Sequence, residues 1–204
     1  MGYLRFATHP QVRISPDIPV PWWGLNDLGR SRAAVLATQP WIARTTRLIS
    51  SDETKALETA AVVAAATGLA IEIRRDLHEN DRSSTGYVPH DRFEQVADAF
   101  FNEPLQSVEG WETAKAAQLR VKAATVDLLT DAGTDEDTDS DILIVAHGAV
   151  GTLLLCDLLG LPISRMEDQV GGEAAPGGGN YWTFSRSAGT VLHRWRSFEI
   201  GNVL

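Results

Sequence analysis

The sequence has only one cysteine in 204 residues, Cys156, and it lies in the apolar run TLLLCDLLGL. A single thiol excludes an intrachain disulfide and is typical of a protein from a reducing compartment. The first residues, MGYLRFATHP, lack the apolar core of a signal peptide. No window approaches the run of about 20 apolar residues that a membrane span needs. We therefore expect a cytoplasmic protein with no membrane partner.

Basic residues are also scarce. The chain has 18 Lys and Arg against 27 Asp and Glu, which gives a formal net charge of −9, and no Lys/Arg-rich run interrupts the acidic background. Such a surface repels a nucleic-acid backbone, so nucleic acid is not expected as a partner. A small anion is not excluded, because a few local cations and a helix N-terminus can hold a phosphate inside an acidic protein.

The composition that remains is that of a globular protein, with 44% hydrophobic and 22% charged residues. The length suits one domain with a sizeable core, and we predict a single domain over residues 1–204. Short apolar runs alternate with helical segments along the chain. This alternation predicts an α/β fold, a three-layer α/β/α sandwich with a mainly parallel central sheet.

The elements follow from local patterns and turn residues. The run ILIVA is continuous and apolar, which indicates a strand buried on both faces. Strands are expected at 3–8, 47–50, 69–75, 142–146, 180–187 and 190–200. Helices are expected at 26–37 (with Asn26 or Asp27 as the N-cap), 50–68 (closed by Gly68), 92–101, 111–130 and 149–160.

Three further segments have less regular patterns. Residues 80–110 are polar and irregular apart from one helix, and we expect them to form a substrate-capping region. The acidic stretch 131–141 reads as a solvated loop without chemistry. The last strand could lie at the sheet edge and form a homodimer contact.

Two histidines follow two predicted strands directly. His9 comes after YLRFAT and His147 after ILIVA. Ligands of open α/β sheets bind outside the carboxyl ends of the strands, so both imidazoles are expected at one site. Either histidine alone could be structural, but two in equivalent places favour a functional pair.

Charged side chains lie at two further junctions. In SSDETKALETAA, Lys55 falls in the first turn of a predicted helix, where its charge and the free N–H groups would together attract an anion. Alternatively, Asp52 and Glu53 simply neutralise Lys55. Glu79 begins the polar loop after the next strand, and burial there would raise its pKa and suit it to general acid catalysis.

With these positions assembled, the chain resembles the histidine phosphatase superfamily, also called the phosphoglycerate mutase-like family, over nearly its whole length. THP at 8–10 stands where the family has Arg-His-Gly, and SSDETKALETA is similar to its Ser-Ser-Pro-Leu, Arg-Ala, Gln-Thr-Ala signature. LHEND resembles the loop that carries the family's acid. ILIVAHGAVGTLLLCDLLGLP matches the family's second-histidine segment most specifically.

The resemblance implies a phosphoglycerate mutase-like fold and a role for each motif residue. His9 would be the nucleophile that takes the phosphoryl group, His147 its partner, and Glu79 the proton donor. The phosphate would contact Thr8, Lys55 and Gly148. Thr8 and Lys55 stand where the family has arginines, so a hydroxyl and an ammonium replace two guanidinium groups. Other cations could compensate, and residues in loops supply the candidates: Arg13 and Arg82, and also His90.

The leading hypothesis is therefore a phosphoric monoester hydrolase that acts on a small phosphorylated substrate through phosphohistidine at His9, with no cofactor. The alternative is a catalytically weakened or inactive family member that binds a phosphorylated ligand. A third interpretation makes His9, His147 and Glu79 a metal site, but nothing in their spacing is specific to metal. We expect no metal.

Overall fold

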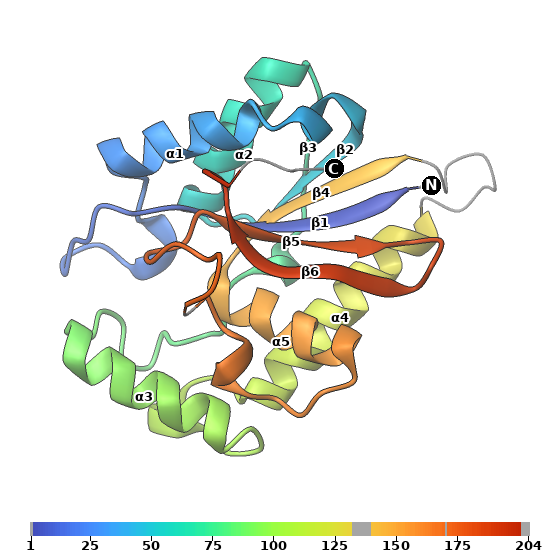
Figure 1. The fold of residues 1–204 in the computed structure, drawn as a ribbon. Helices are drawn as coiled ribbons and strands as arrows, with labels where there is room; N and C mark the ends of the chain where they lie inside the picture. Colours follow the sequence, from blue (N-terminus) through green and yellow to red (C-terminus); the bar gives the residue numbers. More distant parts are fainter. Residues whose placement is uncertain (1, 132–139, 170, 201–204) are drawn as a thin grey trace.

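The fold is organised around one six-stranded sheet (Figure 1). The computed structural model describes residues 2–131, 140–169 and 171–200. The strand order across the sheet is β3-β2-β4-β1-β5-β6. The strands are β1 (Tyr3–Thr8), β2 (Thr45–Ser50), β3 (Ile71–Ile73), β4 (Asp141–Ala146), β5 (Asn180–Ser185) and β6 (Thr190–Ser197).

Four neighbouring strands are parallel, because β4 pairs with β1 and β2, and β2 pairs with β3, all in the same direction. β5 is antiparallel to β1, and β6 is antiparallel to β5. The prediction of a mainly parallel sheet is confirmed, and the last strand lies at an edge as expected.

Helices cover both faces of the sheet. Figure 1 shows α1 and α2 on one face, α4 and α5 on the other, and α3 to one side. The α-helices are α1 (Asp27–Ala37), α2 (Thr54–Thr67), α3 (His90–Asn102), α4 (Ala114–Asp131) and α5 (Gly148–Leu159). Short 3-10 helices are η1 (Val20–Trp22), η2 (Pro40–Arg44), η3 (Arg75–Leu77), η4 (Val108–Gly110) and η6 (Arg165–Glu167). The three-layer prediction is confirmed.

The core explains why residues 142–146 of β4 are all apolar. Successive side chains of a strand point to opposite faces. Ile142 and Ile144 join the core under α4 and α5, while Leu143 and Val145 join the core under α1 and α2. All four are at most 1% exposed, so this strand needs apolar side chains on both faces.

Helix α2 ends where the sequence predicts. Gly68 follows its last residue with φ of 76°, a left-handed conformation that glycine adopts without steric cost. Its amide N–H donates to the carbonyl oxygen of Ala64 over 2.8 Å, which satisfies one of the carbonyls at the helix end.

The structure corrects several boundaries. The helices predicted at 50–68 and 111–130 begin later, at Thr54 and Ala114, and the strands predicted at 180–187 and 190–200 end earlier, at Ser185 and Ser197. The strand predicted at 69–75 is only Ile71–Ile73, because it pairs with β2 alone at the sheet edge. The loop predicted at 131–141 lies mostly outside the described residues, but its last member, Asp141, begins β4 and is fully buried. Asp141 accepts a hydrogen bond from Arg5 over 2.7 Å, so pairing offsets the burial of its charge.

The parallel strands all end on the same side of the sheet, toward the segment 9–25 and α3 (Figure 1). This end carries both histidines that the sequence singled out. Across the described residues, no helix combines the length and apolar character that crossing a membrane would require.

Candidate active site

His9 continues β1 by one residue. Its backbone N–H donates to the carbonyl of Ala146 over 3.1 Å, so the sheet ladder fixes its position. Its Nδ1 lies 2.9 Å from the carbonyl oxygen of Pro10. Since a carbonyl only accepts, Nδ1 carries the proton and Nε2 keeps its lone pair. The side chain is half-buried, and Nε2 is therefore the available nucleophilic atom.

His147 is the second imidazole of the site. It follows β4, begins α5 as its N-cap residue, and is fully buried. Its ring centroid lies 5.3 Å from that of His9. The Nε2 atom is 2.7 Å from Ser51 Oγ, whereas the buried Nδ1 atom has no hydrogen-bond partner among the described residues. The two histidines come together as predicted, and the buried Nδ1 of His147 is the nitrogen that lacks a polar partner among the described residues.

The glycine-rich loop PGGGN, residues 176–180, contacts the backbone of His9. Gly179 N–H donates to the carbonyl oxygen of His9 over 3.2 Å. A Cβ atom on Gly178 would lie 2.2 Å from that same oxygen, so only glycine permits this approach. Arg32 holds the loop by donating to the Gly178 carbonyl over 2.7 Å. The PGGGN sequence thus positions the backbone of His9.

Lys55 lies in the first turn of α2, as the sequence predicts, and is 2% exposed. Its Nζ donates to the Val20 carbonyl over 3.0 Å and forms a very close ion pair with Glu53. Burial lowers the pKa of Lys55, and Glu53 opposes that shift. Of the two alternatives for this segment, the structure shows the pairing of Lys55 with Glu53.

Glu53 is a buried carboxylate beside both Lys55 and His147. It is 7% exposed, and its Oε1 lies 3.6 Å from His147 Nε2. The same oxygen accepts from the Glu79 backbone N–H over 2.9 Å. Burial pushes the pKa of Glu53 upward, but Lys55 outweighs it, and the net pKa is below the ordinary value. The carboxylate is therefore an anion within the histidine site.

Glu79 occupies the N-terminus of α5. Its carboxylate accepts from the backbone N–H groups of Ala149 over 3.2 Å and of Val150 over 3.1 Å. Burial raises the pKa of Glu79, Arg82 opposes the rise and Glu53 adds to it. A carboxyl group with a raised pKa one helical turn from His147 fits the predicted role of proton donor.

Thr8 is 1% exposed, and its hydroxyl has partners other than the site. The hydroxyl donates to Gln169 Oε1 over 2.8 Å and to the Asn180 carbonyl oxygen over 3.3 Å. It accepts a hydrogen bond from Asn180 N–H over 3.1 Å. Direct phosphate binding by Thr8 stays a prediction, but the structure directs this hydroxyl to Gln169. Gly148 is the first residue of α5, with the Gln169 amide against it.

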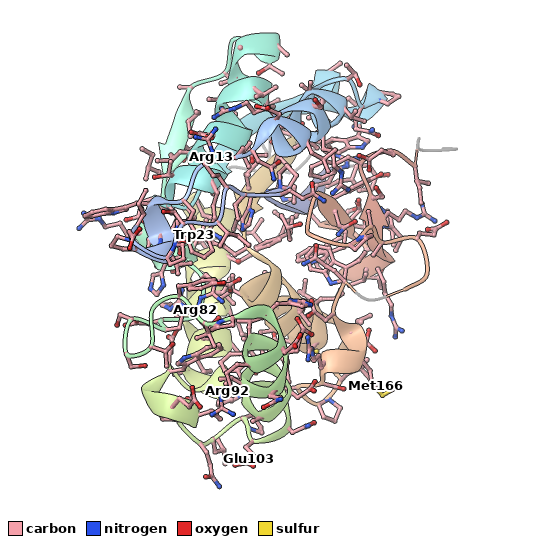
Figure 2. All side chains as sticks on the ribbon, turned by 90° about the vertical axis from the view of Figure 1, so that its left-hand side faces the viewer. Arg13, Trp23, Arg82, Arg92, Glu103 and Met166 are labelled. Carbon is pink, nitrogen blue, oxygen red and sulfur yellow. The ribbon has the colours of Figure 1, made fainter. Side chains whose placement is uncertain are left out.

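The candidate cations lie in different places, and His90 is not in a loop but begins α3, where it is exposed. Arg82 lines a cleft together with Glu53 and Glu79, and its guanidinium lies over the rings of Phe93 and Trp111 at 5.0 and 5.9 Å. Within the described residues it makes no ion pair. Figure 2 looks onto this end of the sheet and shows Arg82 between the loop of Trp23 and α3, with the exposed Arg13 beyond Trp23.

The cleft has a volume of about 820 Å³ and adjoins the histidine site through Glu53 and Glu79. One wall is the proline-rich segment 16–21, and the other is formed by residues 78–83 with Gly86 and Tyr87. The lining of the cleft includes Glu53, Glu79 and Arg82 but neither of the two site histidines. From residue 80 onward, the second wall belongs to the irregular region 80–110 that the sequence predicts as a cap.

The described part of the chain contains no group of three or more His, Cys, Asp or Glu arranged to hold a metal ion. Moreover, the Glu79 carboxylate is directed to the amides of α5 and not between the two imidazoles. The three residues of the metal interpretation therefore do not converge on one point.

Both site histidines are neutral at pH 7. Burial is the main cause that lowers the pKa of each well below 6.5, and Lys55 contributes in both cases. Neutral His9 is a nucleophile, whereas a protonated imidazole would have no lone pair.

This neutrality predicts acid sensitivity of the fold. Below pH 6.5 the histidine of the unfolded chain becomes protonated, whereas buried His147 of the folded chain stays neutral. The free energy of unfolding is therefore highest above pH 6.5 and decreases as the pH falls below this value. For His147 alone the slope is up to about 1.4 kcal/mol per pH unit. Urea unfolding between pH 8 and 5.5 measures it, and His147→Gln should reduce the slope. An unchanged free energy across this range would contradict buried neutral histidines.

Three residues of the site had weak signals or none in the sequence. Ser51 and Glu53 lie in the segment that the sequence singles out for Lys55, but their contacts with His147 depend on how α2 meets β4. Gln169 lies far along the chain, in an irregular segment after α5. Only the fold brings it to Thr8.

Comparisons with known proteins agree with the geometry. The sequence model of the histidine phosphatase superfamily (branch 1) matches residues 10–175, beginning directly after His9. A search of the curated proteins finds no match.

Several solved structures share the fold at low sequence identity. The mycobacterial glucosyl-3-phosphoglycerate phosphatase with inorganic phosphate superposes with a TM-score of 0.73 at 22% identity, over 98% of this chain and 99% of that one. The α-ribazole phosphatase of Shigella flexneri gives 0.73 at 20%, over 99% and 100% of the two chains. YhfR of Bacillus stearothermophilus gives 0.74 at 19%, over 98% of each.

Proposed function

The chain belongs to the histidine phosphatase superfamily, and on that premise we propose that it is a phosphoric monoester hydrolase that works through a phosphohistidine at His9. The observation that carries the proposal is the His9–His147 pair, with ring centroids 5.3 Å apart at the carboxyl ends of β1 and β4. The His9 Nδ1–Pro10 hydrogen bond leaves Nε2 with a lone pair, as a nucleophile requires.

In the first step, His9 Nε2 forms a bond to phosphorus and the ester P–O bond breaks. The leaving oxygen takes the bonding electron pair and a proton from the Glu79 carboxyl group, whose pKa is raised by burial. In the second step, water attacks phosphorus, Glu79 takes back a proton, and the N–P bond breaks to release phosphate and free His9. Two displacements thus replace one difficult hydrolysis.

Positive charge and hydrogen-bond donors must balance the charge of the transferring phosphoryl group. Lys55 and Arg82 supply the charge near the site. The buried Nδ1 of His147 has no partner among the described residues, and a phosphate oxygen would satisfy it. In this proposal the loop at 78–87 covers the substrate's organic part, as a cap.

Arg82 gives the first test of this charge balance. Arg82→Ala should lower kcat/KM for a phosphomonoester by roughly 10- to 30-fold, because it removes a guanidinium from the cleft next to Glu79. Arg82→Lys should lower kcat/KM by less than Arg82→Ala does, because lysine keeps a positive charge at this position. Steady-state kinetics measure both, with Arg92→Ala on α3 as a control whose guanidinium pairs with Glu109 on the surface. Equal effects from Arg82→Ala and Arg92→Ala would remove Arg82 from the site.

The proposed reaction is tested by mixing the protein with a panel of small phosphomonoesters, one of them labelled with ³²P, and quenching in alkali. Phosphohistidine survives alkali and is destroyed by acid, so label that stays on the protein in alkali and leaves in acid identifies the intermediate. Phosphate release without such label would contradict covalent catalysis at a histidine.

One observation favours a second candidate, a weakened family member that mainly binds a phosphorylated ligand. Glu53 stands where the family signature has leucine, and it neutralises the ammonium of Lys55. A phosphate must compete with this internal carboxylate. Melting shifts with phosphorylated ligands but no turnover would support the binding protein. Multiple turnover of any phosphomonoester would exclude it.

A further inference from the structure

Gln169 lies between the residues that precede His9 and follow His147. Its Oε1 accepts hydrogen bonds from Thr8 Oγ1 and from Asn180 Nδ2, both over 2.8 Å. On the other side, its Nε2 lies 2.7 Å from the position that a Cβ on Gly148 would take. The amide thus spans the gap between Thr8 at the end of β1 and Gly148 at the start of α5, the chain neighbours of His9 and His147.

The orientation of this amide is determined by its neighbours. Asn180 accepts from Ala175 N–H over 2.7 Å through Oδ1 and donates to the Ala175 carbonyl over 2.9 Å through Nδ2. The same Nδ2 donates to Gln169, so the Gln169 atom that faces it must be an oxygen. The NH₂ group of Gln169 consequently points away from Asn180, toward α5. Among the described residues, this NH₂ group has no acceptor.

Thr8 stands where the family motif carries arginine, and that arginine's task is to present N–H donors. The threonine hydroxyl and the Gln169 amide form a chain of Cβ, Oγ1, Oε1, Cδ and Nε2. This chain is similar in length to an arginine side chain from Cβ to its terminal nitrogen, and it likewise ends in N–H donors. One hydrogen bond of 2.8 Å stands in for two of the arginine's covalent bonds, and the positive charge is absent.

We propose that Gln169, held by Thr8 and Asn180, is a phosphate-binding residue whose Nε2–H group donates to the phosphoryl group on His9. The inference rests on the proposed phosphatase function. Two residues then share the role of the family's arginine. Gln169 provides the hydrogen-bond donor beside the histidines, and Arg82 provides the positive charge from the cleft.

The test compares three variants with the wild-type protein. Gln169→Ala removes the donor from a half-buried side chain, with little risk to the fold. Gly148→Ala leaves Gln169 intact but places a methyl group 2.7 Å from its Nε2, which must move. Gln106→Ala, at an exposed position between α3 and α4, is the control.

The readouts are kcat/KM for a phosphomonoester and the inhibition constant of inorganic phosphate. We expect Gln169→Ala to weaken phosphate binding and to lower kcat/KM, each by roughly 10- to 100-fold, in line with the loss of one transition-state donor. Gly148→Ala should shift both in the same direction, and the double variant should be no worse than Gln169→Ala, because both changes remove one contact. Gln106→Ala should match the wild type.

A purely structural Gln169 would give a different pattern. The melting temperature of Gln169→Ala would fall while its phosphate inhibition constant stayed at the wild-type value, and this result would overturn the proposal. Failure of the underlying function is distinguishable, because then the wild-type protein itself would neither bind phosphate nor hydrolyse an ester. A wild type that does both beside an unaffected Gln169→Ala overturns the inference alone.

Discussion

His9→Ala is expected to lower kcat for phosphomonoester hydrolysis by roughly 10⁴-fold or more and to abolish the alkali-stable protein phosphate. The reason is that, of the two site histidines, His9 has the free Nε2 lone pair, whereas His147 in this proposal contacts a phosphate oxygen through Nδ1 and does not attack phosphorus. His147 is fully buried, and its Nε2 is bonded to Ser51. Without the His9 lone pair, only direct attack by water remains. Single-turnover hydrolysis with labelled substrate measures the residual rate.

The matched control is His90→Ala, because His90 begins α3 with 82% of its side chain exposed. It should leave the rate and the labelling unchanged. The His9 variant should also retain phosphate binding within a few-fold, since Lys55, Arg82 and Gln169 remain. Equal hydrolysis by wild type and His9→Ala would show that the activity comes from another group or a contaminant.

The sequence identifies the parts of this site that follow from strand ends. His9 and His147 are predicted together because parallel strands deliver their carboxyl ends to one edge, and the continuous apolar run before His147 marks a strand buried on both faces. Local sequence pattern and one topological rule are enough to place these two histidines. The three-layer architecture is predictable in the same way, because it does not depend on any particular long-range contact.

Contacts between distant segments are different in kind. Thr8 and Gln169 are 161 positions apart, and no periodicity links them. Glu53 is adjacent to Lys55 in sequence, yet whether its carboxylate turns to Lys55 or to solvent depends on burial between η1 and α2, which the sequence does not specify. For the same reason Asp141 reads as part of an acidic loop, although the fold buries it against Arg5.

Glu53→Gln is expected to tighten the binding of inorganic phosphate by roughly 10- to 100-fold. The wild-type carboxylate lines the cleft and pairs with Lys55, so a phosphate that approaches Lys55 meets a buried like charge. Two like charges about 4 Å apart repel by roughly 4 kcal/mol at an effective dielectric constant near 20, and movement or protonation of Glu53 relieves part of this. Glutamine can still accept from Glu79 N–H, so the backbone contact remains.

Stability separates this explanation from a change in packing. Glu53→Gln leaves the 2%-exposed Lys55 without its carboxylate, and such a loss costs roughly 3–5 kcal/mol in the absence of a ligand. Phosphate then supplies the missing anion, so the variant should melt lower than wild type without phosphate and show the larger phosphate-induced shift. Asp52→Asn is the control, because this acid lines the same cleft but is 36% exposed and pairs with Arg75. If Glu53→Gln bound phosphate more weakly than wild type, Glu53 would orient Lys55 for the ligand and not compete with it.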